Sequence, residues 1–124
     1  MITGVVKSDE ARIRLKVRGP HGRDEEVEAI IDTGYTASLT LPPALIAAMG
    51  LHWRSLDRGT LADGSECLVD VYEAKVVWDG KLREILVDEA DVDPLVGMRL
   101  LKGYELRMQV RPRGRVTIKR LPRN

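Results

Sequence analysis

An apolar run that stops at a carboxylate constrains this sequence more than any other feature. The strand-forming residues 29–31 (Ala-Ile-Ile) lead directly into Asp32-Thr33-Gly34. Glycine has no Cβ, so the backbone can turn sharply there and its N–H can point at the Asp32 carboxylate. The threonine adds a short hydroxyl that can make a fixed hydrogen bond. The same tripeptide also suits an ordinary turn, so its meaning depends on the rest of the chain.

The composition predicts one globular domain that spans residues 1–124, with 44% hydrophobic and 31% charged residues. The formal net charge of +1 gives no strong preference for a charged partner. The chain has no Phe, and aromatic residues make up only 4%. Val, Leu and Ile must therefore form most of the core, which favours a sheet.

Short alternating segments indicate a mainly β fold. In residues 11–17, apolar side chains alternate with basic ones, which is the pattern of a strand with one wet face. We expect seven to nine such strands at short spacing, and hence a closed or nearly closed β-barrel. The expected strands are residues 2–7, 11–17, 26–31, 38–41, 69–78, 82–87, 95–97, 104–110 and 116–118.

Between these expected strands, the sequence contains patterns typical of turns and short helices. Asp63-Gly64 and Asp79-Gly80 are typical of two-residue hairpin turns. Residues 42–50 begin with two prolines and end with a glycine, which predicts a short helix with a glycine C-cap. Residues 98–103 are expected to form a further turn or two of helix.

The surroundings of Asp32 resemble the retropepsin-like aspartic proteases, specifically the small bacterial members with one lobe. The resemblance rests on the strand that ends in Asp-Thr-Gly, on residues 35–42 after it, and on Leu95-Val96-Gly97 about sixty residues later. It covers about residues 10–110. It implies a closed acid-protease β-barrel with one or two short helices, and an aspartic endopeptidase that hydrolyses peptide bonds.

The resemblance also implies roles for individual residues. Asp32 is the catalytic residue, Thr33 reaches across a dimer to lock two such loops together, and Gly34 supplies a backbone donor to the carboxylate. Leu95-Val96-Gly97 and the short helix after it are expected to pack behind the catalytic loop, because a glycine there lets two backbones approach closely.

This chemistry needs two carboxylates that share one proton. The ionised one acts as general base on a water, and the protonated one polarises the scissile carbonyl and later donates its proton. The chain has only one Asp-Thr-Gly, at Asp32, and is too short for two lobes. The second carboxylate is therefore expected from another copy, which predicts a homodimer with an inactive monomer. Edge strands near residues 1–7 and 104–119 are the expected interface.

Two features differ from the viral members. The expected flap, residues 60–69, carries an acid at its tip, whereas viral tips are rich in glycine. Tyr35 stands where viral members commonly have Ala; its side chain could narrow the cleft, contact substrate or simply pack. The predicted substrate-binding residues are Tyr35, Leu61, Ala62, Asp63, Gly64 and Ser65.

No cofactor or metal is predicted. Cys67 is the only cysteine, which excludes an internal disulfide and a zinc site built on cysteines. His21 and His52 have no partner at metal-ligand spacing. The sequence has neither a signal pattern nor an apolar run of membrane-spanning length, so we expect a cytoplasmic protein with no membrane partner.

Two alternatives remain open. From Arg99 onward the chain has nine Lys and Arg residues and one acid, Glu105, so a small basic barrel could hold nucleic-acid phosphates. The sequence argues against that partner, because readers of single strands need stacking aromatics and none follows Tyr104. The other alternative is a protease fold kept as a dimeric scaffold without turnover.

Overall fold

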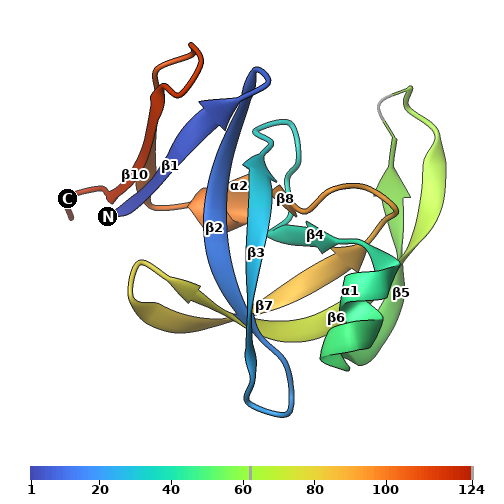
Figure 1. Ribbon diagram of the computed structural model, residues 1–124. Helices are drawn as coiled ribbons and strands as arrows, with labels where there is room; N and C mark the ends of the chain where they lie inside the picture. Colours follow the sequence, from blue (N-terminus) through green and yellow to red (C-terminus); the bar gives the residue numbers. More distant parts are fainter. Residues whose placement is uncertain (62, 124) are drawn as a thin grey trace.

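The computed structural model describes residues 1–61 and 63–123, which form ten strands and two short helices (Figure 1). The mainly β fold is confirmed, although the predicted seven to nine strands were too few. The elements are β1 Ile2–Lys7, β2 Glu10–Arg18, β3 Asp24–Ile31, β4 Leu39–Leu41, α1 Pro43–Met49, β5 His52–Thr60, β6 Glu66–Trp78, β7 Lys81–Glu89, β8 Leu95–Val96, α2 Met98–Leu101, β9 Tyr104–Met108 and β10 Arg115–Arg120.

The strands join into one sheet whose middle closes on itself. Their order is β5-β6-β7-β4-β8-β3-β2-β1-β10-β9, and β6 also pairs with β2. The second pairing runs antiparallel from Lys16↔Val77 to Arg18↔Lys75. Six strands, β2, β3, β8, β4, β7 and β6, therefore form a ring, with β5 outside it on one side and β1, β10 and β9 on the other.

Alternation along the strands places the core inside this sheet. In β2, Ile13, Leu15 and Val17 are buried, while the basic residues between them face acids of β3 on the outer side. Trp78, at the end of β6, is 1% exposed and is the largest fully buried side chain among the described residues. The core thus consists mostly of aliphatic side chains, as the lack of Phe requires.

The first helix forms as its sequence predicts. Two prolines precede and open α1, where their missing N–H groups leave no helical bond unmade. Gly50 ends the helix in a left-handed conformation (φ 62°, ψ 37°), and its N–H bonds to the Ala47 carbonyl at 3.1 Å. Ile46 and Met49 are the buried residues of the helix, so α1 covers the core beside β5 and β6 (Figure 1).

The two predicted hairpin turns behave differently. Asp79-Gly80 forms the expected two-residue turn, since Trp78 pairs with Lys81 and both turn residues have positive φ. The turn at Asp63-Gly64 is longer than predicted, because the last strand pair is Thr60↔Glu66. Asp63 accepts hydrogen bonds from Ser65, and this local bonding shapes the longer loop.

The termini differ from the prediction in one respect. The N-terminal strand β1 is not an edge strand, because it pairs with β2 on one side and β10 on the other. The pairing of Ile2 with Ile118 places the start of β1 beside β10 (Figure 1). Of the terminal strands, only β9 leaves an edge of the sheet open.

Candidate active site

Two parallel strands position Asp32. The strand β3 ends at Ile31 and runs parallel to β8, with Ile31 opposite Val96. The Asp32 N–H donates to the Val96 carbonyl at 2.9 Å, which extends the pairing by one residue. The backbone of Asp32 is therefore fixed by the last hydrogen bond of the ladder, and the chain turns away just beyond it.

The Asp-Thr-Gly turn orients the carboxylate. The Gly34 N–H donates to Asp32 Oδ1 at 3.0 Å, as the sequence predicts. The Tyr35 N–H donates to the Asp32 carbonyl at 3.1 Å and closes the turn. Asp32 is half-buried, whereas Thr33 and Gly34 are exposed. One carboxylate oxygen is thus held by the backbone, at a surface that a second molecule could reach.

The Leu95-Val96-Gly97 segment packs behind this turn, as predicted. The Gly97 N–H donates to the Ser38 carbonyl at 3.0 Å, and the Met98 N–H donates to the Tyr35 carbonyl at 2.8 Å. A Cβ on Gly97 would collide with the Ala37 carbonyl and would lie 2.6 Å from Cδ2 of Tyr35. Only glycine fits between the two backbones.

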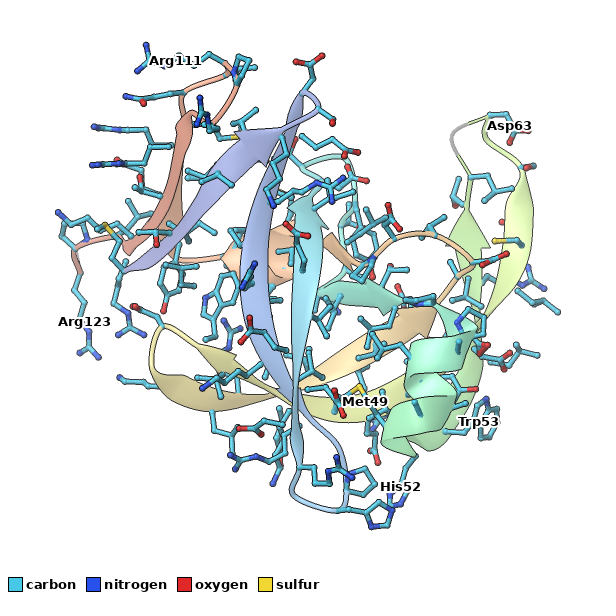
Figure 2. The ribbon with its side chains drawn as sticks, in the orientation of Figure 1. Met49, His52, Trp53, Asp63, Arg111 and Arg123 are labelled. Carbon is cyan, nitrogen blue, oxygen red and sulfur yellow. The ribbon has the colours of Figure 1, made fainter. Side chains whose placement is uncertain are left out.

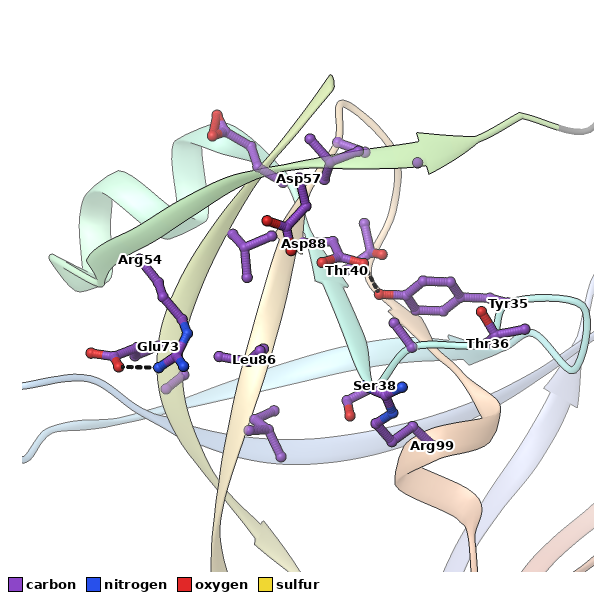
Figure 3. A pocket seen from close by; sticks show the side chains of 18 of the residues that line it. Tyr35, Thr36, Ser38, Thr40, Arg54, Asp57, Glu73, Leu86, Asp88 and Arg99 are labelled. Carbon is purple, nitrogen blue, oxygen red and sulfur yellow. Dashed lines mark hydrogen bonds and ion pairs between the residues drawn. The ribbon is translucent and has the colours of Figure 1, made fainter. Parts of the chain in front are cut away.

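A cleft of about 1310 Å³ lies beside the Asp32 turn. One wall is residues 34–38, and most of the remaining lining comes from β5, β6 and β7 (Figure 3). The turn between β2 and β3, Thr40 of β4 and Arg99 of α2 also contribute to it. The lining includes Gly34 and Tyr35, but Asp32 lies just beyond it. An ion pair of 3.0 Å between Arg54 and Glu73 lies at the far end of the cleft (Figure 3).

The hairpin of β5 and β6 borders the same cleft. Of the predicted substrate-binding residues on it, Leu61 lines the cleft, whereas Asp63, Gly64 and Ser65 lie at the exposed tip outside the lining. Ala62 lies outside the described residues. Asp63 Oδ1 accepts hydrogen bonds from the Ser65 hydroxyl (2.5 Å) and the Ser65 N–H (2.9 Å), which lower the pKa of the Asp63 carboxyl.

Tyr35 makes a contact that the sequence did not reveal. Its hydroxyl donates to Asp88 Oδ2 at 2.7 Å, from the Asp32 loop to strand β7 (Figure 3). Burial raises the pKa of the Tyr35 phenol, and Asp88 adds to the rise. The predicted alternatives of packing and cleft lining both hold, since the ring also lies against Gly97. No spacing signal links residues 53 positions apart.

The described residues were also compared with what a membrane span or a metal site requires. No helix within residues 1–61 and 63–123 is long and apolar enough to span a membrane. Over the same ranges, no three His, Cys, Asp or Glu side chains gather where they could hold a metal ion. The only carboxylate on the Asp-Thr-Gly turn is that of Asp32.

Comparison with known proteins gives the fold. No protein-family model and no curated protein matches the sequence. The structure is similar to a retropepsin-like aspartic protease from Rickettsia conorii, with a TM-score of 0.61 and 17% identity over 93% of this chain and 87% of that one. It is also similar to EIAV protease complexed with the inhibitor HBY-793, with a TM-score of 0.59 and 15% identity over 77% of this chain and 88% of that one. The chain therefore has the fold of the retropepsin-like aspartic proteases.

Proposed function

We propose that this protein is an aspartic endopeptidase that acts as a homodimer. The observation that carries the proposal is the Asp32 carboxylate: it ends a buried strand, is oriented by the Gly34 N–H at 3.0 Å, and lies beside a cleft of about 1310 Å³. A cleft of this size, between a sheet and a hairpin, can hold an extended peptide.

The proposed reaction needs a second carboxylate close to Asp32. Two like charges held together cannot both ionise, so the pair shares one proton and titrates as a unit. The ionised member takes a proton from the attacking water, and the protonated member donates to the scissile carbonyl and then to the leaving nitrogen. The chain has one Asp-Thr-Gly, so we assign the second carboxylate to Asp32 of another copy on a two-fold axis.

The other predicted site residues fit this arrangement. Thr33 is exposed beside Asp32, where its hydroxyl is free to contact the second copy. The hairpin of β5 and β6 serves as the flap, which closes over the peptide and excludes water from the carboxylates. Gly97 allows the supporting backbone to approach the Asp32 loop.

The nucleic-acid alternative has less support. The basic residues Arg111 and Arg123 lie on the opposite side of the molecule from Asp63 at the hairpin tip (Figure 2). The shallow groove on the outer face of β9 and β10 contains Arg107, Arg115 and Lys119, but also Glu105 and no aromatic side chain. Phosphates could bind there only as isolated contacts, without stacking of bases.

The test is cleavage of a peptide library by the wild type and by Asp32→Asn, from acidic to neutral pH, with and without a pepstatin-like inhibitor. We expect cleavage by the wild type, inhibition by the pepstatin-like compound, and a loss on the order of 10⁴-fold in Asp32→Asn. Asp9→Asn is the matched control, because Asp9 lies in an exposed turn at φ 62°, which Asn adopts readily. Equal cleavage by the wild type and Asp32→Asn would remove the assignment.

A further inference from the structure

The side chain of Tyr35 is a fixed wall of the cleft next to the Asp32 loop. Its hydroxyl is tied to Asp88 at 2.7 Å, and its backbone N–H and carbonyl are bonded to Asp32 (3.1 Å) and Met98 (2.8 Å). Its ring lies where any side chain on residue 97 would collide with it. A side chain held at both ends cannot swing aside for a substrate without breaking these contacts.

This wall borders the cleft directly beside the Asp32 loop, which the proposed function places at the scissile bond. Tyr35 lines the cleft (Figure 3). Gly34, the residue before it, also belongs to the lining. The ring therefore occupies space that a smaller residue at position 35 would leave open to the peptide. Filling a subsite in this way discriminates by size, because a large substrate side chain would have to displace a packed ring.

The Tyr35 hydroxyl also binds the carboxylate of Asp88. Asp88 is a half-buried residue on β7 that lines the same cleft, and one of its carboxylate oxygens accepts the Tyr35 hydrogen bond. A partly enclosed carboxylate without that donor would favour a cationic side chain as its partner. While the bond is made, Asp88 is less available to a lysine or arginine of the peptide.

Building on the proposed function, we propose that Tyr35 determines specificity: it restricts the subsite beside the Asp32 loop to small, uncharged side chains of the peptide substrate, by filling its space and by engaging Asp88. The ring sets the size limit and the hydroxyl sets the charge preference. The two effects are separable by substitution, since Tyr35→Ala removes both groups and Tyr35→Phe removes only the hydroxyl.

The experiment is a positional scan of peptides cleaved by the wild type, Tyr35→Phe, Tyr35→Leu and Tyr35→Ala. We expect one position at which the wild type prefers Gly, Ala or Ser, and at which Tyr35→Ala gains about tenfold or more for Leu and Phe. Tyr35→Leu should give an intermediate gain, and it replaces the alanine variant if circular dichroism shows the latter to be unfolded. Equal size selectivity in the folded variants and the wild type would overturn the proposal.

A second comparison tests whether the Tyr35 hydroxyl controls the preference for uncharged side chains. Tyr35→Phe should keep the preference for small residues among uncharged side chains but gain about tenfold for Lys or Arg at that same position. The gain should vanish in the double variant Tyr35→Phe with Asp88→Asn, which removes the charge. A gain that persists in the double variant, or no gain in Tyr35→Phe, would contradict the role of the hydroxyl.

Binding separates this inference from the proposed function. The same peptides are titrated into Asp32→Asn proteins with and without the Tyr35 substitutions, and affinity is measured by calorimetry. Selective binding that changes with residue 35 supports the wall even if the wild type cleaves nothing, in which case only the proposed function fails. If the wild type cleaves peptides but its selectivity does not change with residue 35, the proposed function stands and the specificity role of Tyr35 is contradicted.

Discussion

The loop around Asp32 and the hairpin of β5 and β6 border the same cleft but are built in opposite ways. The loop is bonded to a segment about sixty residues away, through Val96, Met98 and Arg99. The hairpin tip is bonded within itself, by Leu61, Gly64 and Ser65. In β5, which lies at the edge of the sheet, no residue is fully buried.

This difference matches the two tasks of the proposed enzyme. A catalytic carboxylate must be held in one geometry, and long-range backbone contacts do that for Asp32. A flap must open and close, so it is drawn from the parts of a protein with few buried contacts. Substitutions in the Asp32 loop should therefore lower the stability of the whole domain, as core substitutions do. Substitutions in the hairpin tip should change only the local opening of the hairpin.

The largest effect is expected for Gly97→Ala, behind the Asp32 loop. The new methyl group would meet the Ala37 carbonyl and the Tyr35 ring and carbonyl, at 2.6 and 2.7 Å for the two Tyr35 atoms. Because backbone lies on the crowded side, we expect a loss of about 3 kcal/mol in the free energy of unfolding, the upper part of the usual range for overpacking. Urea unfolding measures it, and a loss no larger than that of a surface substitution would contradict the close packing.

A smaller effect is expected for Gly64→Ala, in the hairpin tip. Nothing lies within 4 Å of a Cβ there, so the cost comes only from the positive φ of 86°. We expect about 1 kcal/mol. Hydrogen exchange should show faster opening in the hairpin and no change at Asp32 and Tyr35. Faster exchange throughout the Asp32 loop would show that the loop and the hairpin are coupled, and would contradict their independence.

The loop should also respond to alkali through Tyr35. Burial holds the pKa of its phenol above the ordinary value, so above about pH 10 the unfolded chain loses this proton while the folded protein keeps it. The unfolded state then binds fewer protons, and stability falls as pH rises. In Tyr35→Phe this part of the alkaline loss should be absent. Urea unfolding of both proteins on either side of pH 10 tests it, and parallel losses would contradict it.

The smallest effect is expected at the hairpin tip in acid. The Ser65 hydroxyl and N–H lower the pKa of Asp63, so their contribution is complete above the ordinary value of about 3.9 and is lost as pH falls through the folded value. NMR should show the Ser65 amide shifting with the Asp63 carboxyl. Asp63→Asn keeps an acceptor without a titrating group, so its Ser65 amide should stay unchanged; a shift in that variant would assign the change to another group.

Local patterns predicted much of the fold and of the site. The alternation in residues 11–17, the prolines and glycine around α1, and the turn at Asp79-Gly80 each have a local physical cause. The Gly34 bond to Asp32 was predictable for the same reason, since donor and acceptor are two residues apart. The position of Leu95-Val96-Gly97 behind the Asp32 turn was predicted from the family resemblance.

What the sequence did not predict depends on contacts between distant segments. The start of β5, residues 52–57, has no apolar alternation that would predict a strand. It forms a strand because its backbone pairs with β6. The Tyr35–Asp88 bond joins the Asp32 loop to β7, which extends two residues beyond the predicted strand 82–87, and its two residues lie 53 positions apart. The position of β1 between β2 and β10 depends on a C-terminal strand more than a hundred residues away.

The measurement that tests the central claim most directly is a mixing titration of wild type with Asp32→Asn at constant total concentration, with subunits allowed to exchange. If one carboxylate from each of two copies makes the site, mixed dimers are inactive, and cleavage should fall as the square of the wild-type fraction. If each chain carries a complete site, cleavage would fall in direct proportion to that fraction. A linear dependence, with exchange confirmed by mass-tagged subunits, would contradict the account.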